Sequence, residues 1–572
     1  MRRPSFVRNL LRLSRAAFVV ATATALLAVG CTEATGLRDD DVGRPIDAAD
    51  PAFSMGPPNG FPIVTVTHRA PPAQQAGGPR VSSLAAAIER VQPGGIIRID
   101  DGDWETGGVV IDRPVRLEPA PGASPLLVNN GTANGLTIAG VESGTVELVG
   151  LRFLNAAGRT AIAANGVYDR VVVRDAVVTV TSPSTTTAYG IRTLSDEVDT
   201  GWLIVENVTF EGGRYGVLIT AGQAEVTGSR FREHSVAAVQ FTQRSRGAVR
   251  DNDINGCGTN ACIQAGDPDG IVIENNRIEH PVGFARNGIR VLHRFAGEDH
   301  AVIRGNEVHG TGVQSDAFAS DERPLNASGL RHGIIALGVH AIVEDNRVSG
   351  AHWGISHQRR SSGRITGNHV SKCGWVCIAM VQPSAPSIIE HNTVEGDVSF
   401  RRVIAAIRGE SQGESATITI RDNVIASTFA GDRADARNYG FELGILAMSW
   451  EPSRNDQPRI AGVPVEVYGN SIADAGFGLV SFHGGSMNAR DNTVTGVSIG
   501  VSAWGAVEAI DAQRNDILDA HVGVAGDGDV LARCNWWGSI HGPSNPRVAA
   551  SQYTPVAVKP IANRPEGACV PK

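Results

Sequence analysis

The sequence predicts an all-β solenoid, a parallel β-helix built from stacked coils. An asparagine recurs in the frame hydrophobic-x-x-Asn-x-hydrophobic every 20 to 24 residues wherever no insertion interrupts it. A second run, Gly-hydrophobic-x-hydrophobic, follows some ten residues later, as at Gly288 and Gly333. A repeat of this size is typical of solenoids. About 22 residues without a helical stretch are too few for a βαβ unit, which needs roughly 30. They suffice for one coil of a β-helix with two short strands per coil.

The asparagines are predicted to form a structural ladder. Successive coils place them about 4.8 Å apart, so their side-chain amides can hydrogen-bond from coil to coil inside the turn. Asparagine also tolerates the left-handed backbone of a tight corner. The predicted ladder consists of Asn252, Asn276, Asn306, Asn346, Asn368, Asn392, Asn423, Asn470, Asn492, Asn515 and Asn535. Four earlier segments carry Leu151, Ala176, Val208 and Ser229 in the same slot.

Charged residues alternate beside this slot. Two positions before it, consecutive coils read Arg250, Glu274, Arg304 and Glu344. Opposite charges on neighbouring strands stabilise their register by about 0.2–1 kcal/mol per pair. We therefore interpret these charges as structural rather than catalytic.

The N-terminus has the features of a targeting segment. Residues 1–30 contain five arginines followed by the apolar stretch 16–29, which is too short to span a membrane. The sequence LeuAlaValGlyCys31 resembles the bacterial lipoprotein box, and this implies lipidation of Cys31 and attachment to a membrane surface. Ordinary secretion after Ala21-Thr-Ala23 is the alternative. Both place the protein in the cell envelope or outside the cell.

The segment after the predicted signal peptide is polar and flexible in composition. Residues 31–60 are rich in Asp, Pro, Gly and Ala and predict a tether. The first thirty residues hold five of the 51 Lys and Arg and none of the 59 Asp and Glu, so the processed chain has a formal charge of −13. No Lys/Arg cluster with interleaved aromatic residues occurs, which argues against a nucleic-acid partner.

Six cysteines other than Cys31 predict disulfides, as expected in an oxidising envelope. Two of the predicted pairs occupy equivalent positions in two coils, where each would link the ends of the turn between two strands. The third pair would link the C-terminal tail to the last coil. A shared zinc site is excluded because Cys257 and Cys373 lie four coils, roughly 19 Å, apart. The predicted pairs are Cys257 with Cys262, Cys373 with Cys377, and Cys534 with Cys569.

Both ends of the array carry closing segments. Residues 82–91 have helical spacing with serine as cap, and a Pro-Gly turn, a strand and Asp-Gly-x-Trp104 follow. This order resembles the opening segment of right-handed parallel β-helix proteins of the pectate-lyase-like superfamily. The run CysAsn535TrpTrpGly resembles a closing motif of repeat arrays in bacterial envelope proteins. The resemblance implies a right-handed β-helix over residues 61–545, with first strands at 109–111, 115–117, 126–128 and 136–138 and a tail at 546–572.

The superfamily includes polysaccharide lyases, glycoside hydrolases and many non-enzymatic surface proteins, so the fold alone does not specify function. The chain has only three lysines, Lys372, Lys559 and Lys572, which argues against a lysine-based lyase. The paired carboxylates of polygalacturonase-type hydrolases are missing from the coil strands.

The predicted binding face is the second strand of each coil and the loop after it. Tryptophan can stack on sugar rings, and arginine can pair with carboxylates or sulfates of an acidic glycan. The alternative is that these are scattered loop residues, with His357 facing inward. The candidate residues are Arg290, His293, His357, Arg359, Arg360, Trp450, His483 and Trp504.

No cofactor is expected from the sequence. The turn AspProAspGly270 is a weak candidate for calcium, since two carboxylates alone do not make a site. Copper is not expected because no Met/His/Cys cluster occurs. Long insertions at 310–331 and 427–463 are the other places where a site is expected.

Two functional hypotheses follow. The first is a non-enzymatic, envelope-anchored protein that binds glycan or serves as a scaffold. The second is an arginine-dependent lyase or a glycosidase that uses loop carboxylates such as Glu442, Glu451 or Asp456. Carboxylates that converge within about 6–9 Å beside Arg290, Arg359 or Arg360 would favour the enzyme. The sequence specifies neither the ligand nor the oligomeric state.

Overall fold

The computed structural model describes residues 61–547 except 69–78, 158, 182–187, 195–200, 221, 280–286, 294–299, 311–329, 398–402, 412–414, 432–433, 436–438, 450–462, 483, 505–509, 527–529 and 540–542. The predicted signal peptide, Cys31, the tether, Cys569, most of the 310–331 insertion and about half of the 427–463 insertion lie outside these residues. Within the described ranges, no helix is long and apolar enough to cross a membrane.

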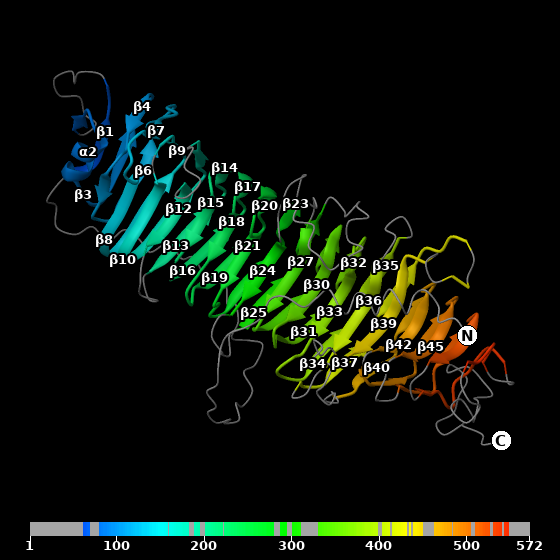
Figure 1. Cartoon of the computed structure of the whole chain (residues 1–572). Coiled ribbons are helices and arrows are strands. Elements are labelled where there is room, and N and C mark those ends of the chain that lie inside the picture. Colours follow the sequence, from blue (N-terminus) through cyan, green and yellow to red (C-terminus); the bar gives the residue numbers. More distant parts are fainter. Residues whose placement is uncertain are drawn as a thin grey trace, which may run out of the picture.

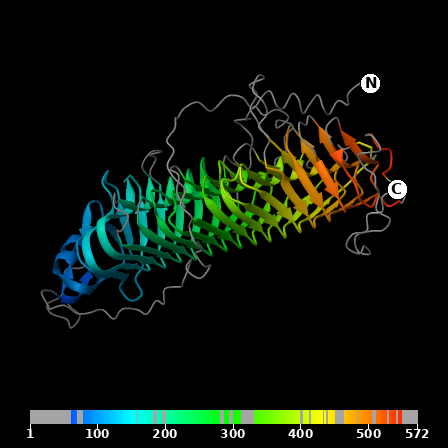
Figure 2. The same cartoon turned by 90° about the horizontal axis from the view of Figure 1, so that it is seen from below.

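The chain forms a parallel β-helix in which each coil contributes one strand to each of three walls (Figures 1 and 2). One coil consists of β19 (Arg246–Arg250), β20 (Asp253–Cys257) and β21 (Ala261–Gly266). Each strand pairs in parallel with its equivalent in the next coil, as Ile254 with Ile278 and Ile263 with Ile289. We call the strands before the asparagine the first wall, those after it the second wall, and those with the glycine frame the third wall.

The first wall consists of β1 (Phe61–Val66), β3 (Val91–Ile99), β6 (Val115–Pro119), β13 (Trp202–Glu206), β16 (Gln223–Thr227), β19, β22 (Ile271–Glu274), β25 (His300–Arg304), β28 (His340–Glu344), β31 (Ser362–Thr366), β34 (Ser387–Glu390), β37 (Ile418–Arg421), β40 (Val465–Tyr468), β43 (Met487–Arg490), β46 (Ile510–Gln513) and β49 (Val530–Leu531). The long strands β8 (Leu136–Val149) and β10 (Thr160–Arg174) run from the third wall into the first. The short strand β2 (Arg80–Val81) pairs with β1.

The second wall consists of β4 (Asp103–Glu105), β7 (Leu126–Asn129), β9 (Arg152–Asn155), β11 (Val177–Val180), β14 (Thr209–Gly212), β17 (Arg230–His234), β20, β23 (Arg277–Glu279), β26 (Glu307–His309), β29 (Arg347–Ser349), β32 (His369–Ser371), β35 (Thr393–Gly396), β38 (Val424–Ser427), β41 (Ser471–Ala473), β44 (Thr493–Thr495) and β47 (Asp516–Leu518).

The third wall consists of β5 (Val109–Ile111), β12 (Tyr189–Leu194), β15 (Tyr215–Ile219), β18 (Ala237–Phe241), β21, β24 (Asn287–Leu292), β27 (Leu330–Leu337), β30 (Ala351–Gln358), β33 (Val376–Val381), β36 (Val403–Glu410), β39 (Phe441–Met448), β42 (Phe477–Phe482), β45 (Ile499–Trp504) and β48 (Val522–Gly526). Glycine is required in this frame. A Cβ on Gly288 would lie 2.5 Å from Cγ1 of Val308 and 2.6 Å from the carbonyl oxygen of Gly333.

The prediction of two strands per coil was wrong, because the first run breaks at the asparagine. The residue before the asparagine, not the asparagine, adopts the left-handed conformation, as Asp251 (φ 55°) and Asp345 (φ 54°) show. This turn directs the asparagine side chain inward, where Asn252 and Asn346 are buried. Three strands per coil follow from this corner.

The buried asparagine amides hydrogen-bond from coil to coil. Both the backbone N–H of Asn346 and its Nδ2 donate to Oδ1 of Asn368, over 2.9 and 3.0 Å. The same Nδ2 donates to the carbonyl oxygen of Ile303 at 2.9 Å. Equivalent bonds join every step from Asn252 to Asn535. Ser229 continues the series, since its N–H donates to Oδ1 of Asn252 at 2.9 Å.

Ion pairs line the outer surface of the first wall. Glu274 accepts from Arg250 and Arg304 on the two neighbouring coils, at 2.6 Å each. The buried Glu390 pairs with Arg364 and Arg421. Burial opposes ionisation of Glu390, but hydrogen bonds from the two guanidinium groups outweigh it and lower the pKa of this carboxyl.

The helix α2 (Leu84–Arg90) covers the front of the stack, which confirms the predicted capping helix. The Ser83 side chain accepts from the backbone N–H of Ala86 at 3.2 Å, and the apolar face of the helix is buried. This face shields the first coil from water, as an end of a solenoid requires.

The last coil is closed by the tryptophan motif. The N–H of Trp536 donates to Asn515 O at 2.8 Å, and the Trp537 side chain is buried in the interior core. Beyond it, the Gly523 N–H donates to Ser544 O at 2.7 Å, and the Arg547 N–H donates to Val524 O at 2.9 Å. Cys534 is disulfide-bonded.

Candidate functional site

The outer surface of the third wall carries an unusual set of polar and aromatic side chains in the middle of the solenoid. In each strand, the residue before the glycine and the residue two after it point away from the interior. Parallel register aligns Asn287 with His332 and Trp353 in one column, and Arg290 with Ile335 and Ser356 in the next. Five consecutive strands, β24 to β36, span about 19 Å along the axis. We call the following residues the central cluster: Arg290, Arg331, His332, His352, Trp353, Trp375 and Arg408.

Trp353 lies at the centre of this cluster. Its ring stacks on the His332 ring, with centroids 5.8 Å apart, and Cζ of Arg408 lies 5.7 Å from the Trp353 ring centroid. The His352 ring tilts against Trp375 at 5.8 Å. Aromatic rings attract cations through the negative face of their quadrupole, so the guanidinium and the rings hold one another in place.

The two histidines of the cluster are neutral at neutral pH. Burial, with a smaller contribution from Arg331, lowers the pKa of His352 to about 4. Burial lowers the pKa of His332 well below its ordinary value, and nearby Arg331 and Arg290 add to this effect. The Nδ1 of His332 lies 3.2 Å from Oγ of Ser356. Neutral imidazoles both donate and accept hydrogen bonds, as sugar hydroxyls require.

The charge of the cluster is carried by its three arginines. Arg408 pairs with Glu410, whose Oε1 also accepts from Nε2 of Gln382 at 3.3 Å. Arg290 and Arg331 add two further guanidinium groups to this surface, on a chain whose formal charge as a whole is −8.

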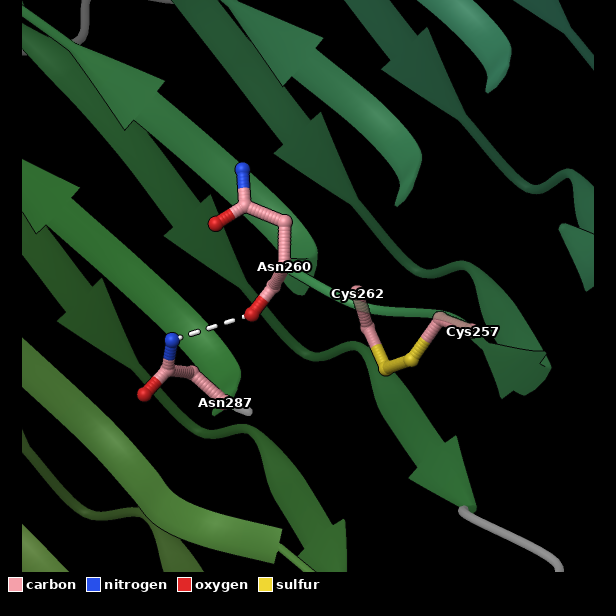
Figure 3. The surroundings of a disulfide bond; sticks show 4 residues. All are labelled: Cys257, Asn260, Cys262 and Asn287. Carbon is pink, nitrogen blue, oxygen red and sulfur yellow. Dashed lines mark hydrogen bonds between the residues drawn. A yellow bond between two sulfur atoms is a disulfide. The ribbon is translucent and has the colours of Figure 1, made fainter. Parts of the chain in front are cut away.

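A disulfide braces the corner that holds Asn260 (Figure 3), and Asn260 contacts Arg290. Cys257 and Cys262 are bonded, and Asn260 lies between them in the sequence. Nη1 of Arg290 donates to Oδ1 of Asn260 at 2.9 Å. Nδ2 of Asn287 donates to the carbonyl oxygen of Asn260 at 3.0 Å (Figure 3). Cys373 and Cys377 are also bonded, and Trp375 lies between them in the sequence, at the corner between β32 and β33.

His293 and Asp267 form a second polar feature at the edge of this face. Nδ1 of His293 lies 3.4 Å from Oδ1 of Asp267, and both side chains are largely buried. Asp267 begins the AspProAspGly turn that the sequence suggested for calcium. Among the described residues, no group of three or more His, Cys, Asp or Glu is placed to hold a metal ion.

The structure gathers only part of the predicted glycan face. Arg290 belongs to the central cluster, and His293 lies just beyond it at the end of β24. Arg359 and Arg360 are exposed in the turn after β30, with φ angles of 55° and 66°. Trp450 and His483 lie outside the described residues.

The placement of His357 on the glycan face was wrong. Its side chain is fully buried and lies between Ala336 and Met380 in an interior column of the third wall. The neighbouring Ser356 points outward, so strand alternation directs His357 inward. Burial lowers the pKa of His357 to about 3.

Trp504 packs against an apolar cluster on the outer face of the third wall, and Trp353 and Trp375 of the central cluster pack against the same apolar cluster. Its buried members include Leu443, Leu446, Phe477 and Val480. Ser502 and Ala379, which the sequence placed on a mild outward surface, are fully buried here. The polar face therefore ends near β36.

His332, Trp353 and Arg408 were not among the residues predicted from the sequence. The signal was the residue before the glycine of the third-wall frame, which reads Asn287, His332 and Trp353 in successive coils. Arg408 carried no such signal, because its coil departs from the frame.

Asp267 and Glu410 are too far apart to act as a glycosidase pair. They belong to coils five steps apart, about 24 Å along the axis. Glycosidases need about 5 to 9.5 Å. Glu442 lies on β39, whereas Glu451 and Asp456 lie outside the described residues.

Comparison with known proteins supports the fold. A family model described as right-handed β-helix region matches residues 186–322, so the fold class is the predicted right-handed parallel β-helix. No curated protein matches the sequence.

Solved structures give weak similarities. The periplasmic alginate epimerase AlgG shares 12% identity with a TM-score of 0.33, over 77% of this chain and 86% of that one. The A-module of the Azotobacter vinelandii mannuronan C-5 epimerase AlgE6 shares 12% identity with a TM-score of 0.27, over 76% and 91%. A tailspike protein of E. coli bacteriophage HK620, in complex with a pentasaccharide, shares 10% identity with a TM-score of 0.30, over 76% and 74%. Similarities at this level carry no information on function.

Proposed function

We propose that this protein binds an acidic polysaccharide, without catalysis, on the outer face of β24 to β36, as a cell-envelope protein anchored through Cys31. One observation carries the proposal: Trp353 stands between His332 and Arg408 at the centre of an arginine-bearing surface on an acidic chain.

The chemistry of the cluster suits such a ligand. The half-buried Trp353 and Trp375 offer apolar surface to the C–H face of a sugar ring. Guanidinium groups bind carboxylates and sulfates through paired, charge-assisted hydrogen bonds. Neutral His332 and His352 add donors and acceptors for hydroxyls. The acidic remainder of the chain repels polyanions elsewhere, which confines binding to this surface.

Replacement of Trp353 by alanine or of Arg290 by glutamine is expected to weaken binding of acidic polysaccharide about 10- to 100-fold, or about 1.4–2.8 kcal/mol, since each loses a stacking surface or a charged hydrogen bond. The measurement is a glycan array of acidic and neutral polysaccharides, followed by titration calorimetry on the hits. Arg347→Gln, an exposed arginine on the second wall, is the matched control. Unchanged affinity in both cluster variants would place binding elsewhere, and no binding to any glycan would leave a scaffold role.

The His293–Asp267 pair favours a second candidate, a lyase acting on the same polymer. A carboxylate that orients an imidazole is an arrangement for proton abstraction. In that case the protein releases unsaturated sugar products over time, and His293→Gln lowers the rate at least 100-fold while retaining binding. Absence of unsaturated product from every bound polysaccharide would exclude this candidate.

A further inference from the structure

A second platform of aromatic rings and arginines lies on the same outer face, toward the N-terminal end. The rings of Tyr189 on β12 and Tyr215 on β15 stack with centroids 5.4 Å apart and an interplanar angle of 14°. With Leu218 and Ala237 they form an apolar cluster separate from the interior core. Both rings are buried, with exposed fractions of 8% and 9%, whereas Arg192 and Arg214 are partly exposed. The tyrosines therefore position the two guanidinium groups, and the guanidinium groups are what this cluster offers to a ligand.

Each tyrosine carries its own guanidinium group. Cζ of Arg192 lies 5.0 Å from the centroid of Tyr189, and Cζ of Arg214 lies 5.4 Å from that of Tyr215. Among the described residues, Arg192 forms no ion pair with a carboxylate. The pattern of a cation over an aromatic ring is the one that Arg408 and Trp353 form in the central cluster.

Strand register connects the two platforms. Arg192 aligns in turn with Leu218, Gln240, Gln264 and Arg290, so Arg192 and Arg290 share one outward column. They lie four coils, about 19 Å, apart.

The surface between the platforms is lined by small and amide side chains. Beside the column of Arg192 and Arg290 runs a second outward column. In it Tyr215 aligns with Ala237 on the next strand, and Ala261 aligns with Asn287. Gln240 and Gln264 supply amides, which donate to and accept from sugar hydroxyls. From Tyr215 to Trp353 the column runs five coils, about 24 Å. Between Tyr215 and Asn287 the residues of this column are Ala237 and Ala261, which are both small.

We propose that Tyr189, Arg192, Arg214 and Tyr215 form a second sugar-binding site, and that the ligand is a long, linear acidic polysaccharide lying parallel to the solenoid axis. This inference rests on the proposed function of the central cluster. A polymer held at both platforms gains avidity, because binding at the second site becomes intramolecular. A polysaccharide fragment too short to reach beyond the central cluster does not gain this avidity.

The test compares fragments of one acidic polysaccharide that differ in length, titrated against the full-length protein in mild detergent. Short fragments span less than about 20 Å, and long fragments span more than about 38 Å, the extent of both platforms over the eight coil steps from β12 to β36. Long fragments are expected to bind at least tenfold tighter than short ones. The double variant Arg192→Gln/Arg214→Gln keeps both tyrosines, and it is expected to remove this advantage while leaving short-fragment affinity unchanged. Trp353→Ala is expected to weaken both.

The matched control is Arg230→Gln/Arg232→Gln, two exposed arginines of β17 on the second wall. It is expected to leave the affinity for both fragment lengths unchanged. If long fragments bind no tighter than short ones, or if the Arg192/Arg214 variant keeps the long-fragment affinity, the second site is overturned while the central cluster stands. If wild-type protein binds neither length of any acidic polysaccharide, the proposed function itself fails.

Discussion

Replacing Asn368 by leucine is expected to lower the free energy of unfolding by about 3–5 kcal/mol. Asn368 is buried in the middle of the asparagine ladder. Its Nδ2 donates to Oδ1 of Asn392, to Val343 O and to Thr366 O, each at 2.9 Å. Its Oδ1 accepts two bonds from Asn346. Leucine leaves these partners buried without hydrogen bonds, and each such group costs about 1–3 kcal/mol.

The measurement is urea denaturation followed by circular dichroism, combined with amide hydrogen exchange. Solenoids unfold in segments, so exchange should accelerate most in the coils on either side of residue 368. Asn255→Ala on β20, an asparagine outside the ladder and half-exposed, is the control and should cost less than about 0.5 kcal/mol. A loss below about 1 kcal/mol in Asn368→Leu would show that water or relaxation satisfies the freed groups.

Two interior histidines, His234 and His357, are expected together to contribute about 2 kcal/mol of destabilisation when the pH falls from 6 to 5. Burial lowers the pKa of His357 to about 3 and that of His234 to about 4, against about 6.5 in the unfolded chain. Well above pH 6.5 both histidines are neutral in the folded and in the unfolded chain, so they do not change the free energy of unfolding with pH. Below it the unfolded chain binds protons that the folded chain does not, so stability falls until the folded pKa is reached.

The variant that tests this prediction is His357→Met, because the next coil already holds Met380 in the same interior column. Its unfolding free energy should lose about 1 kcal/mol less than wild type between pH 6 and pH 5. The exposed His521→Gln is the control and should follow wild type. Parallel stability curves for wild type and His357→Met would show that His357 does not carry the acid sensitivity.

Local regularity made most of the fold predictable. The asparagine and glycine frames recur at a constant phase, so aligning the coils by sequence also aligned Arg250 with Glu274 and Arg304. The capping helix was equally predictable, because Ser83, Leu84, Ala87 and Ile88 show the cap and the apolar face within one short segment. The third strand per coil was missed, since the break depends on the left-handed residue before each asparagine, and Asp, Asn, Gly, His, Arg and Cys all occupy it.

The binding face was less predictable because it depends on which side chains adjacent coils bring together. Arginine, histidine and tryptophan residues were recognised as candidates for sugar binding. Residue type alone did not predict that Arg290 and Trp504 lie on different parts of the third wall. His357 was misplaced because a single residue of strand phase decides between interior and surface.

The sequence by itself determined the parallel β-helix, its repeat and the pairing of two disulfides, because each is set by contacts that recur within one coil or between neighbours. Only the tertiary structure decided the central cluster. His332 and Trp353 occupy equivalent positions in neighbouring coils, but Arg408 comes from a coil that departs from the glycine frame, so no sequence spacing reports its proximity to them. Stacking places strands about 4.8 Å apart whatever the loops between them, and this converts scattered residues into one surface.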